Sequence, residues 1–167
     1  MNINLLKKEN INEILNLYDD IKKNTYTLWD KDYPSKELIE WDIERKGLFG
    51  AFDNGELIAV CFAGERCEDG EEDFPWKDAF LKRGTFARIG VSPKHQNQGV
   101  ATKLLAFILE ELKNQGFDGV RILVGKNNEN AKNLYKKFGF YNCGKTFRYG
   151  HDYFLYELRL LDKEGAK

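Results

Sequence analysis

Apolar residues recur every three or four positions in four segments of the chain, which is the spacing of one face of an amphipathic helix. The first segment follows Asn10, which together with Glu13 three residues later resembles a capping box. The second follows Ser35, a residue type that often caps the N-terminus of a helix. The third begins at Val100 and the fourth is closed by Gly139. These segments predict four helices, with apolar positions Ile11, Ile14, Leu15, Tyr18 and Ile21; Leu38, Ile39, Trp41 and Ile43; Leu104, Leu105, Ile108 and Leu112; and Ala131, Leu134, Tyr135 and Phe138.

Six short apolar runs between and after these helices predict strands. The first two are joined by Asn54 and Gly55, a pair that favours a tight hairpin, so they would pair antiparallel. The third and fourth flank the helix that begins at Val100, and this order fits a right-handed crossover between parallel neighbours. No repeat and no linker interrupts the pattern, which predicts one mixed α/β domain over residues 1–167. The six runs are residues 48–52, 57–63, 85–91, 120–124, 140–143 and 153–160.

Composition favours a folded, water-soluble chain. Of the 167 residues, 42% are hydrophobic and 14% aromatic, which is too core-rich for a disordered or fibrous protein. The longest unbroken apolar stretch, residues 57–64, falls far short of the roughly 18–20 residues that span a membrane. The formal net charge of −1 lacks the basic excess of a nucleic-acid-binding domain. We therefore expect neither a membrane nor a nucleic acid as a partner.

The number and spacing of the cysteines indicate which redox compartment and which kind of metal site the protein could have. Cys61, Cys67 and Cys143 are odd in number and include no C-x-x-C pair, which argues against a disulfide framework and a zinc site. The first residues, MNINLLKKENINE, also lack the long apolar segment of a secretory signal. Reduced thiols in a cytoplasmic protein without a bound metal ion are therefore the expectation.

The segment 91–105, VSPKHQNQGVATKLL, joins a strand end, a turn and the start of a helix. Pro93 stops the strand, and Gly99 allows the backbone to approach a ligand without a Cβ atom. Unpaired N–H groups and the peptide dipoles make such a helix start an anion site, which Lys94 and Lys103 could supplement. An ordinary turn in which Gly99 merely relieves crowding stays open. Neither the G-x-x-x-x-G-K-[ST] nor the G-x-G-x-x-G phosphate motif is present.

Two motifs carry a resemblance to a known family. Gln96 to Ala101 match the Q/R-x-x-G-x-G/A signature of the GNAT superfamily of N-acetyltransferases, between a strand that ends in Val-x-Pro and a long helix. Further downstream the chain resembles the family motif N-x-x-A-x-x-L-Y-x-x-x-G-F. The resemblance implies a single GNAT-like domain of the α/β (α+β) class, with a mixed sheet of six or seven strands splayed at the acyl-CoA site and flanked by four helices. The residues matched to the second motif are Asn127, Asn130, Ala131, Leu134, Tyr135, Gly139 and Phe140.

The resemblance also implies a reaction, which is transfer of the acetyl group of acetyl-CoA to a primary amine by direct attack in a ternary complex. It assigns the pantetheine arm of the co-substrate to the backbone of Ile89 and Val91. Asn127 and Asn130 match positions that contact the pantetheine or order the turn, with helix capping as the alternative for Asn127. The pyrophosphate is assigned to Gln96, Gln98, Gly99, Val100, Ala101 and Thr102.

Tyr135 matches the residue that protonates the leaving thiolate in many family members. A phenol with a reference pKa of about 10 is protonated at neutral pH and can donate to sulfur. Periodicity alone places Tyr135 on the apolar stripe of its helix, and this interpretation stays open. The family's usual carboxylate base is replaced by Ala87 and Arg88, so no direct base is visible. Glu65, Asp73 and His151 are weak candidates, each more typical of a solvated surface.

The acceptor is the least defined part of the prediction. Residues 65–73 hold six carboxylates, typical of a solvated loop, but negative charge beside the acceptor would also attract cationic amines, including cationic small molecules. Along the chain, residues 1–93 hold 13 Lys and Arg against 19 Asp and Glu, while residues 94–167 hold 13 against 8. The basic part thus begins at the predicted pyrophosphate turn. Four aromatic residues could line the acceptor cleft or belong to the core: Trp29, Tyr33, Phe74 and Trp76.

Several alternatives stay open on the sequence. A catalytically silent acyl-CoA sensor would keep the turn but transfer no acyl group, and the missing base is consistent with it. A peptide or protein N-acetyltransferase would differ from a small-molecule enzyme only in its acceptor. Both a monomer and a homodimer are compatible with the sequence.

Overall fold

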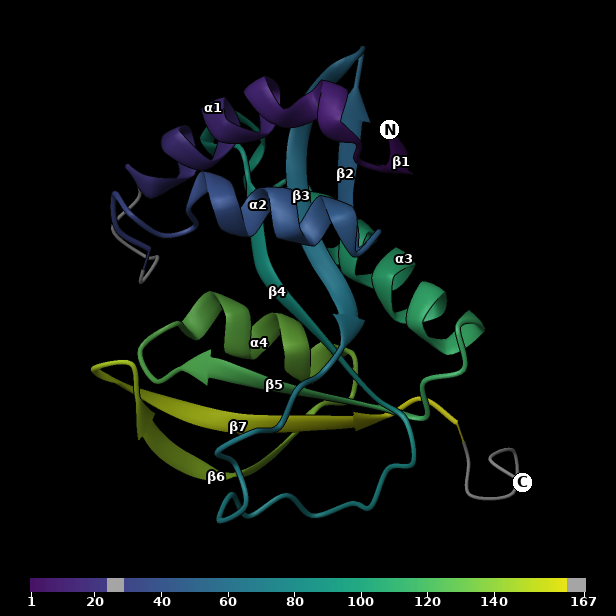
Figure 1. The fold of residues 1–167 in the computed structure, drawn as a ribbon, viewed down its shortest axis with the longest axis vertical. Helices are drawn as coiled ribbons and strands as arrows, with labels where there is room; N and C mark the ends of the chain where they lie inside the picture. The colour runs from purple at the N-terminus through teal and green to yellow at the C-terminus, as the bar shows by residue number, and fades with distance from the viewer. Residues whose placement is uncertain (24–28, 162–167) are drawn as a thin grey trace. The chain divides into compact units, whose positions relative to one another are not determined.

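The computed structural model describes residues 1–23 and 29–161, which fold into two compact units. Unit 1 comprises Met1–Gly64 with Phe86–Ile108, and unit 2 comprises Glu65–Thr85 with Leu109–Lys167. The seven strands follow the order β1-β2-β3-β4-β5-β7-β6, which confirms the predicted mixed sheet. The elements are β1 (Asn2–Leu5), α1 (Ile11–Lys22), α2 (Lys36–Glu44), β2 (Leu48–Asp53), β3 (Glu56–Glu65), β4 (Arg83–Val91), α3 (Val100–Asn114), β5 (Gly119–Gly125), α4 (Glu129–Lys137), β6 (Tyr141–Arg148) and β7 (His151–Arg159) (Figure 1).

Unit 1 packs two helices on an antiparallel set of strands. β2 pairs with β3 and also with β1, a strand that the sequence pattern did not predict because its residues are mostly exposed. Figure 1 shows α1 and α2 lying across β2 and β3. Their apolar faces form a core with these strands, which is why the predicted helical stripes are buried. The core residues are Leu6, Ile14, Leu17, Tyr18, Ile21, Ile39, Ile43, Leu48, Leu57, Val60 and Phe62.

Local sequence signals set the ends of these elements. The Ser35 side chain accepts a hydrogen bond from the Leu38 N–H (3.1 Å), which confirms it as the N-cap of α2. Asn54 and Gly55 both have positive φ (50° and 80°), as the predicted hairpin turn requires. After α2 the left-handed residue is Lys46 (φ 55°) rather than the expected Gly47.

Unit 2 is built around an antiparallel set of three strands. β7 lies between β5 and β6 and pairs antiparallel with both. The first residues of β4, Arg83 and Gly84, pair in parallel with Gly119 and Val120 of β5, as the crossover pattern predicted. β6 extends to Arg148, beyond the predicted end at residue 143, because its last residues are mostly polar and give no continuous apolar run.

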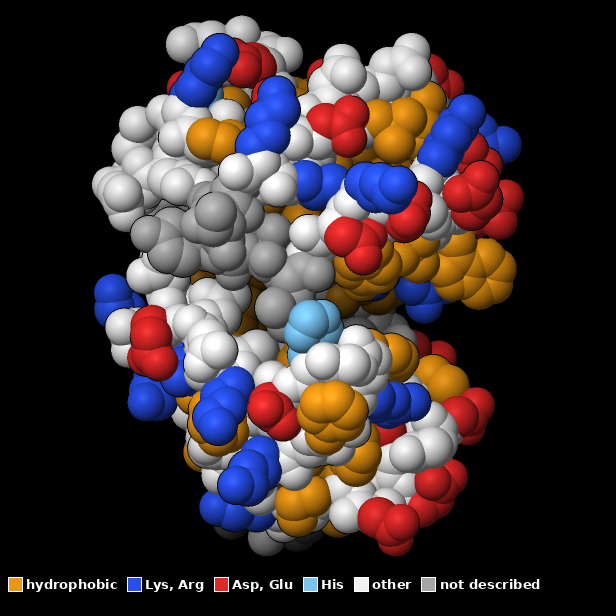
Figure 2. Space-filling model, turned by 90° about the vertical axis from the view of Figure 1, so that its left-hand side faces the viewer, with side chains coloured by type: hydrophobic (Ala, Val, Ile, Leu, Met, Phe, Trp, Pro, Cys, Tyr) orange, Lys and Arg blue, Asp and Glu red, His pale blue; other side chains and the backbone are white. Residues whose placement is uncertain are grey.

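The charge split along the sequence does not appear as a single-sign patch on the face that Figure 2 shows. In Figure 2, Lys and Arg side chains (blue) and Asp and Glu side chains (red) are interspersed over the face shown. Within the described residues no helix is both long and apolar enough to cross a lipid bilayer.

The three thiols differ in environment, which predicts how they react. Cys61 and Cys143 are buried and Cys67 is exposed. Burial and the hydrogen bond to Glu157 Oε1 (2.9 Å) raise the pKa of the Cys143 thiol to about 12, and burial also raises the pKa of Cys61. Because the thiolate is the reactive form, iodoacetamide is expected to label Cys67 first in the native protein, as mass spectrometry can show. Equal labelling of all three thiols before unfolding would contradict this expectation.

Candidate functional site

The turn between β4 and α3 has the backbone geometry of an anion site. After the short 3₁₀ helix Pro93–His95, Asn97 (φ 62°) and Gly99 (φ 79°) are left-handed, and residues 96–99 are all exposed. A Cβ atom at Gly99 would meet no other atom within 4 Å. Gly99 therefore serves the left-handed conformation of the turn and does not relieve crowding.

The start of α3 presents its N–H groups at this turn. The first intrahelical bond there runs from the Lys103 N–H to the Gly99 carbonyl (3.1 Å), so the N–H groups of Val100, Ala101 and Thr102 precede it. Two side chains fix the turn to its surroundings. Gln96 Nε2 donates to the Val91 carbonyl and Gln98 Nε2 donates to the Lys94 carbonyl, both at 3.4 Å. Unit 1 thus brings together the predicted pyrophosphate residues and the end of β4.

β4 carries a backbone irregularity just before the two predicted pantetheine residues, Ile89 and Val91. Arg88 has a φ of 54°, in the left-handed region that is rare for a residue with a side chain. The Tyr18 hydroxyl on α1 donates to the Arg88 carbonyl (3.1 Å) and so contacts the backbone at this point. Burial raises the pKa of Tyr18 well above its usual value, so this hydroxyl keeps its proton. Ile89 and Val91 are half-buried on the same strand.

The Arg88 side chain is paired inside unit 1. Its Nε donates to Asp42 Oδ2 and its Nη2 to Asp42 Oδ1, both at 2.7 Å, and the Asp42 side chain is fully buried. Ala87, the other position where the resemblance implies a carboxylate base, packs against the unit 1 core. Neither position supplies a base, as the sequence indicated. Glu65, Asp73 and His151 are exposed, as expected of surface residues.

The second motif lies in unit 2. Tyr135 is buried on α4, with its ring centroid 5.8 Å from that of Phe140. Asn127 and Asn130 are exposed, and neither caps the helix. The cap is Asn128, whose side chain accepts from the Ala131 N–H (3.1 Å), so capping is not the role of Asn127. In the motif N-x-x-A, the Asn stands three residues before the Ala. In this chain that residue is Asn128, so the motif could have identified Asn128 as the cap from the sequence.

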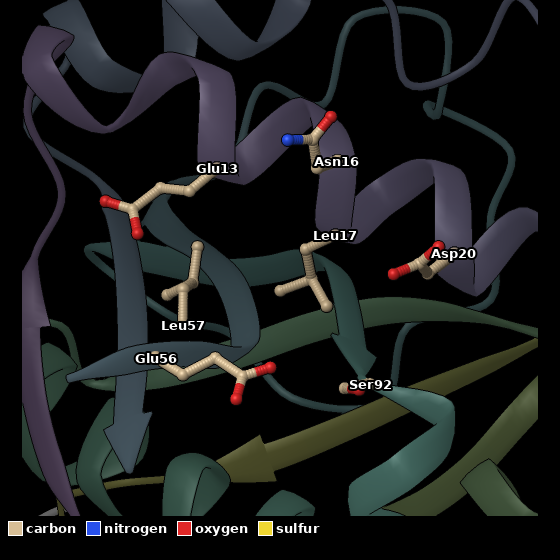
Figure 3. Close-up of a pocket in the computed structure, with 7 residues that line it drawn as sticks. All are labelled: Glu13, Asn16, Leu17, Asp20, Glu56, Leu57 and Ser92. Carbon is tan, nitrogen blue, oxygen red and sulfur yellow. The ribbon is translucent and has the colours of Figure 1, made fainter. Parts of the chain in front are cut away.

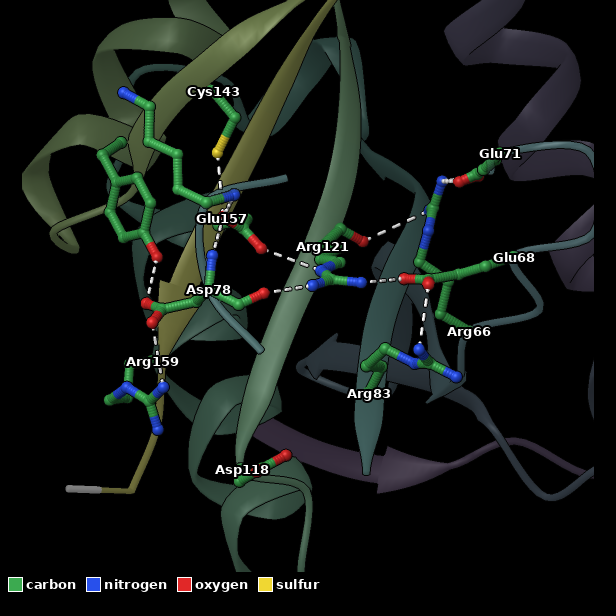
Figure 4. A network of polar contacts seen from close by, with 12 residues as sticks. Arg66, Glu68, Glu71, Asp78, Arg83, Asp118, Arg121, Cys143, Glu157 and Arg159 are labelled. Atoms are coloured by element: carbon green, nitrogen blue, oxygen red, sulfur yellow. Dashed lines mark hydrogen bonds and ion pairs between the residues drawn. The ribbon is translucent and has the colours of Figure 1, made fainter. Parts of the chain in front are cut away.

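Two carboxylates of the acidic loop are paired within unit 2, whereas Glu65, Asp69, Glu72 and Asp73 are exposed, as expected of a solvated loop. Glu68 pairs with Arg121 (2.7 Å) and Arg83 (3.1 Å), and the buried Glu71 pairs with Arg66. Figure 4 shows these groups converging with Glu157 on β7. Two of the six carboxylates thus hold the loop to the strands and supply no free negative charge. The argument from this loop for a cationic acceptor is weakened accordingly.

The aromatic candidates fall into two groups. In unit 2, Phe74 lies 5.7 Å from the Arg148 guanidinium, and Trp76 lies against the guanidinium groups of Arg66 and Arg121 (5.5 and 5.1 Å), so both have structural packing roles. In unit 1, Trp29 and Tyr33 lie beside β4. Trp29 packs on Tyr18 with ring centroids 5.3 Å apart, and the Tyr33 hydroxyl lies 3.4 Å from Arg88 Nη1. Only this second group adjoins the predicted pantetheine strand.

A small pocket in unit 1 lies near the end of β4 but does not suit a diphosphate. Figure 3 shows the Glu13 and Asp20 side chains reaching from α1 toward the same space as Glu56 and Ser92. Three carboxylates there would repel an anion. This pocket is therefore not a candidate site for the pyrophosphate.

Comparison with known proteins tests the resemblance. The model of the acetyltransferase (GNAT) family matches residues 11–140, which is most of the chain. The chain belongs to the GNAT family. The GNAT fold is also seen in solved structures that cover 95% of this chain: a GNAT-family acetyltransferase from Streptococcus agalactiae 2603 (19% identity, TM-score 0.77, 94% of that chain) and the paia N-acetyltransferase from Thermoplasma acidophilum in complex with coenzyme A (20% identity, TM-score 0.72, 98% of that chain).

Curated relatives match the GNAT chain over shorter stretches. N-alpha-acetyltransferase 30 of Schizosaccharomyces pombe is 33% identical over 79 residues, which are 46% of this chain and 53% of that protein. The uncharacterized N-acetyltransferase YsnE of Bacillus subtilis is 31% identical over 78 residues, which are 46% of this chain and 52% of that protein. The chain spans about half the length of these two relatives.

Proposed function

We propose that the protein is an acetyl-CoA-dependent N-acetyltransferase that acts on a primary amine. The observation that carries the proposal is the left-handed turn at Gly99, which leaves an exposed helix start next to the end of β4. Its N–H groups and the positive end of the helix dipole suit a pyrophosphate. The same chemistry is supported by the GNAT family model and by the coenzyme A bound to the Thermoplasma acidophilum protein.

In this proposal the protein residues act as follows. Gln96, Gln98 and the first N–H groups of α3 bind the pyrophosphate, and the backbone of Ile89 and Val91 orients the pantetheine amides. The neutral amine nitrogen forms a bond to the thioester carbonyl carbon as the carbon–sulfur bond breaks. Tyr135 donates its hydroxyl proton to the leaving sulfur and regains a proton from solvent, while the nitrogen loses its extra proton to solvent. The products are the N-acetylated amine and free coenzyme A.

A thiol-release assay with acetyl-CoA and a panel of amines tests the proposal. The panel includes polyamines, aminoglycosides, amino acids and short peptides, so that small-molecule and peptide acceptors are separated. Turnover with any class supports the enzyme. Thermal stabilisation by acetyl-CoA without turnover on any amine would favour the silent sensor instead, and no stabilisation and no turnover would reject both.

Gly99→Ala tests the turn, because alanine at φ 79° costs about 1–2 kcal/mol and tilts the N–H groups away from the ligand. We expect the Kd for acetyl-CoA, measured by calorimetry, to rise at least about tenfold, the loss of one charge-assisted hydrogen bond. Gly55→Ala is the matched control, since Gly55 has the same φ (80°) and the same open surroundings on the β2–β3 hairpin. Equal affinity losses in the two variants would show that general strain, and not the turn, is responsible.

A further inference from the structure

One arginine of unit 1 uses only part of its guanidinium on its buried acid. Arg88 uses Nε and Nη2 on the Asp42 carboxylate, which leaves Nη1 outside that ion pair. Nη1 donates to the Tyr33 hydroxyl (3.4 Å) at the exposed end of the cluster, and this bond leaves the second N–H of Nη1 and the Tyr33 O–H. The Arg88 side chain is only 10% exposed, whereas Tyr33 is 41% exposed. The structure thus presents an Arg N–H and a Tyr O–H side by side at the edge of a buried ion pair.

The cluster has a surplus of positive charge. Asp42 also accepts from Arg45 Nη2 (3.1 Å), so a single buried carboxylate faces two guanidinium groups. Both guanidinium groups lie against the Phe62 ring, Arg45 at 4.1 Å and Arg88 at 5.0 Å. The bonds to Asp42 outweigh the effect of burial and raise the pKa of Arg88, so its charge is fixed. Asp30 and Asp32 on the neighbouring loop are exposed, and the Asp30 carboxylate accepts the Asp32 N–H.

The cluster adjoins the strand that the proposed function assigns to the pantetheine arm. Arg88 immediately precedes Ile89, and the Tyr18 hydroxyl donates to the carbonyl of the left-handed Arg88 backbone. Gly90 makes room for an aromatic wall, because a Cβ atom there would lie 3.1 Å from Trp29 Cη2 and 2.7 Å from Ile21 Cδ1. A small acceptor beside β4 would therefore meet an apolar wall and two convergent donors.

We propose that the amine acceptor carries a carboxylate, which binds to Arg88 Nη1 and the Tyr33 hydroxyl. This inference rests on the proposed function and names its acceptor class. A carboxylate has two oxygens in one plane, which suit a pair of adjacent donors, and bonds to charged groups are the stronger kind. Asp42 acts as a positioning residue, because its two bonds to Arg88 fix the orientation of the guanidinium plane. The acceptor class is then acidic amines of the amino-acid type, in contrast to the polycations that the acidic loop alone would favour.

The experiment measures kcat/KM for matched acceptors: an amino acid, its primary amide and the amine that lacks the carboxyl group. The native protein is expected to prefer the acid over the amide about tenfold or more, the value of a hydrogen bond to a charged group. Tyr33→Phe should reduce this preference severalfold, and Arg88→Gln should abolish it, with the KM for acetyl-CoA unchanged in Tyr33→Phe. Arg88→Lys, which keeps the charge without the planar fork, should restore part of the preference.

Tyr149→Phe is the control, because it removes another exposed tyrosine hydroxyl, on the β6–β7 turn of unit 2. It should leave the acid-to-amide ratio as in the native protein. If Arg88→Gln does not fold, as melting curves would show, Tyr33→Phe decides alone. Turnover with equal rates for acid, amide and amine would overturn the carboxylate site while leaving the proposed function intact. Absence of acetyl-CoA binding and of turnover on every acceptor would instead reject the proposed function.

Discussion

Tyr135→Phe is expected to lower kcat at least about tenfold while changing the Kd for acetyl-CoA less than twofold. The variant keeps the buried ring and its contact with Phe140 but loses the hydroxyl that we propose as the general acid. Proton donation by a positioned side chain is worth roughly 10²–10⁴-fold, so a tenfold loss of kcat is a conservative threshold for this role. Stopped-flow or thiol-release kinetics give kcat, and calorimetry gives the affinity.

Tyr156→Phe is the matched control, because Tyr156 is a second buried tyrosine of unit 2 and has no proposed part in the reaction. Its kcat is expected to stay within about twofold of the native value. If kcat is unchanged in Tyr135→Phe, Tyr135 is not the general acid, and its role is to pack on the apolar stripe of α4. Equal losses in both variants would point to a packing effect instead.

The parts of the site that could be predicted from sequence depend on short-range backbone chemistry. Gly99 and Gly55 have left-handed φ values (79° and 80°) that their own turns require, and Ser35 bonds the N–H three residues ahead. Such signals can be recognised in the sequence because the partner groups are backbone atoms of residues close in the chain. The four helical stripes are equally local, since their apolar positions repeat with the helix itself.

The parts that could not be predicted depend on pairs of side chains far apart in the chain. Arg88 pairs with Asp42, which lies 46 residues away in the sequence, and Glu68 pairs with Arg121, which lies 53 residues away. Nothing in the composition of the acidic loop distinguishes a solvated carboxylate from one that meets a buried arginine. The sequence therefore indicated the co-substrate chemistry but not which two carboxylates of the acidic loop are paired with arginine.

Arg121→Met is expected to lower the free energy of unfolding by about 3–5 kcal/mol, the usual cost of removing one partner from a buried ion pair. The Arg121 side chain is 6% exposed and bonds Glu157 (2.8 Å) and Glu68 (2.7 Å). Methionine fills much of the same volume but leaves the fully buried Glu157 carboxylate without its guanidinium partner. Urea unfolding at constant ionic strength measures the loss.

Arg159→Met is the control, because its pair with Asp78 is more exposed (21% and 27%), so the loss of this pair should lower the free energy of unfolding much less. A deficit of Arg121→Met no larger than that of Arg159→Met would mean that the network of Figure 4 contributes little to the stability of unit 2.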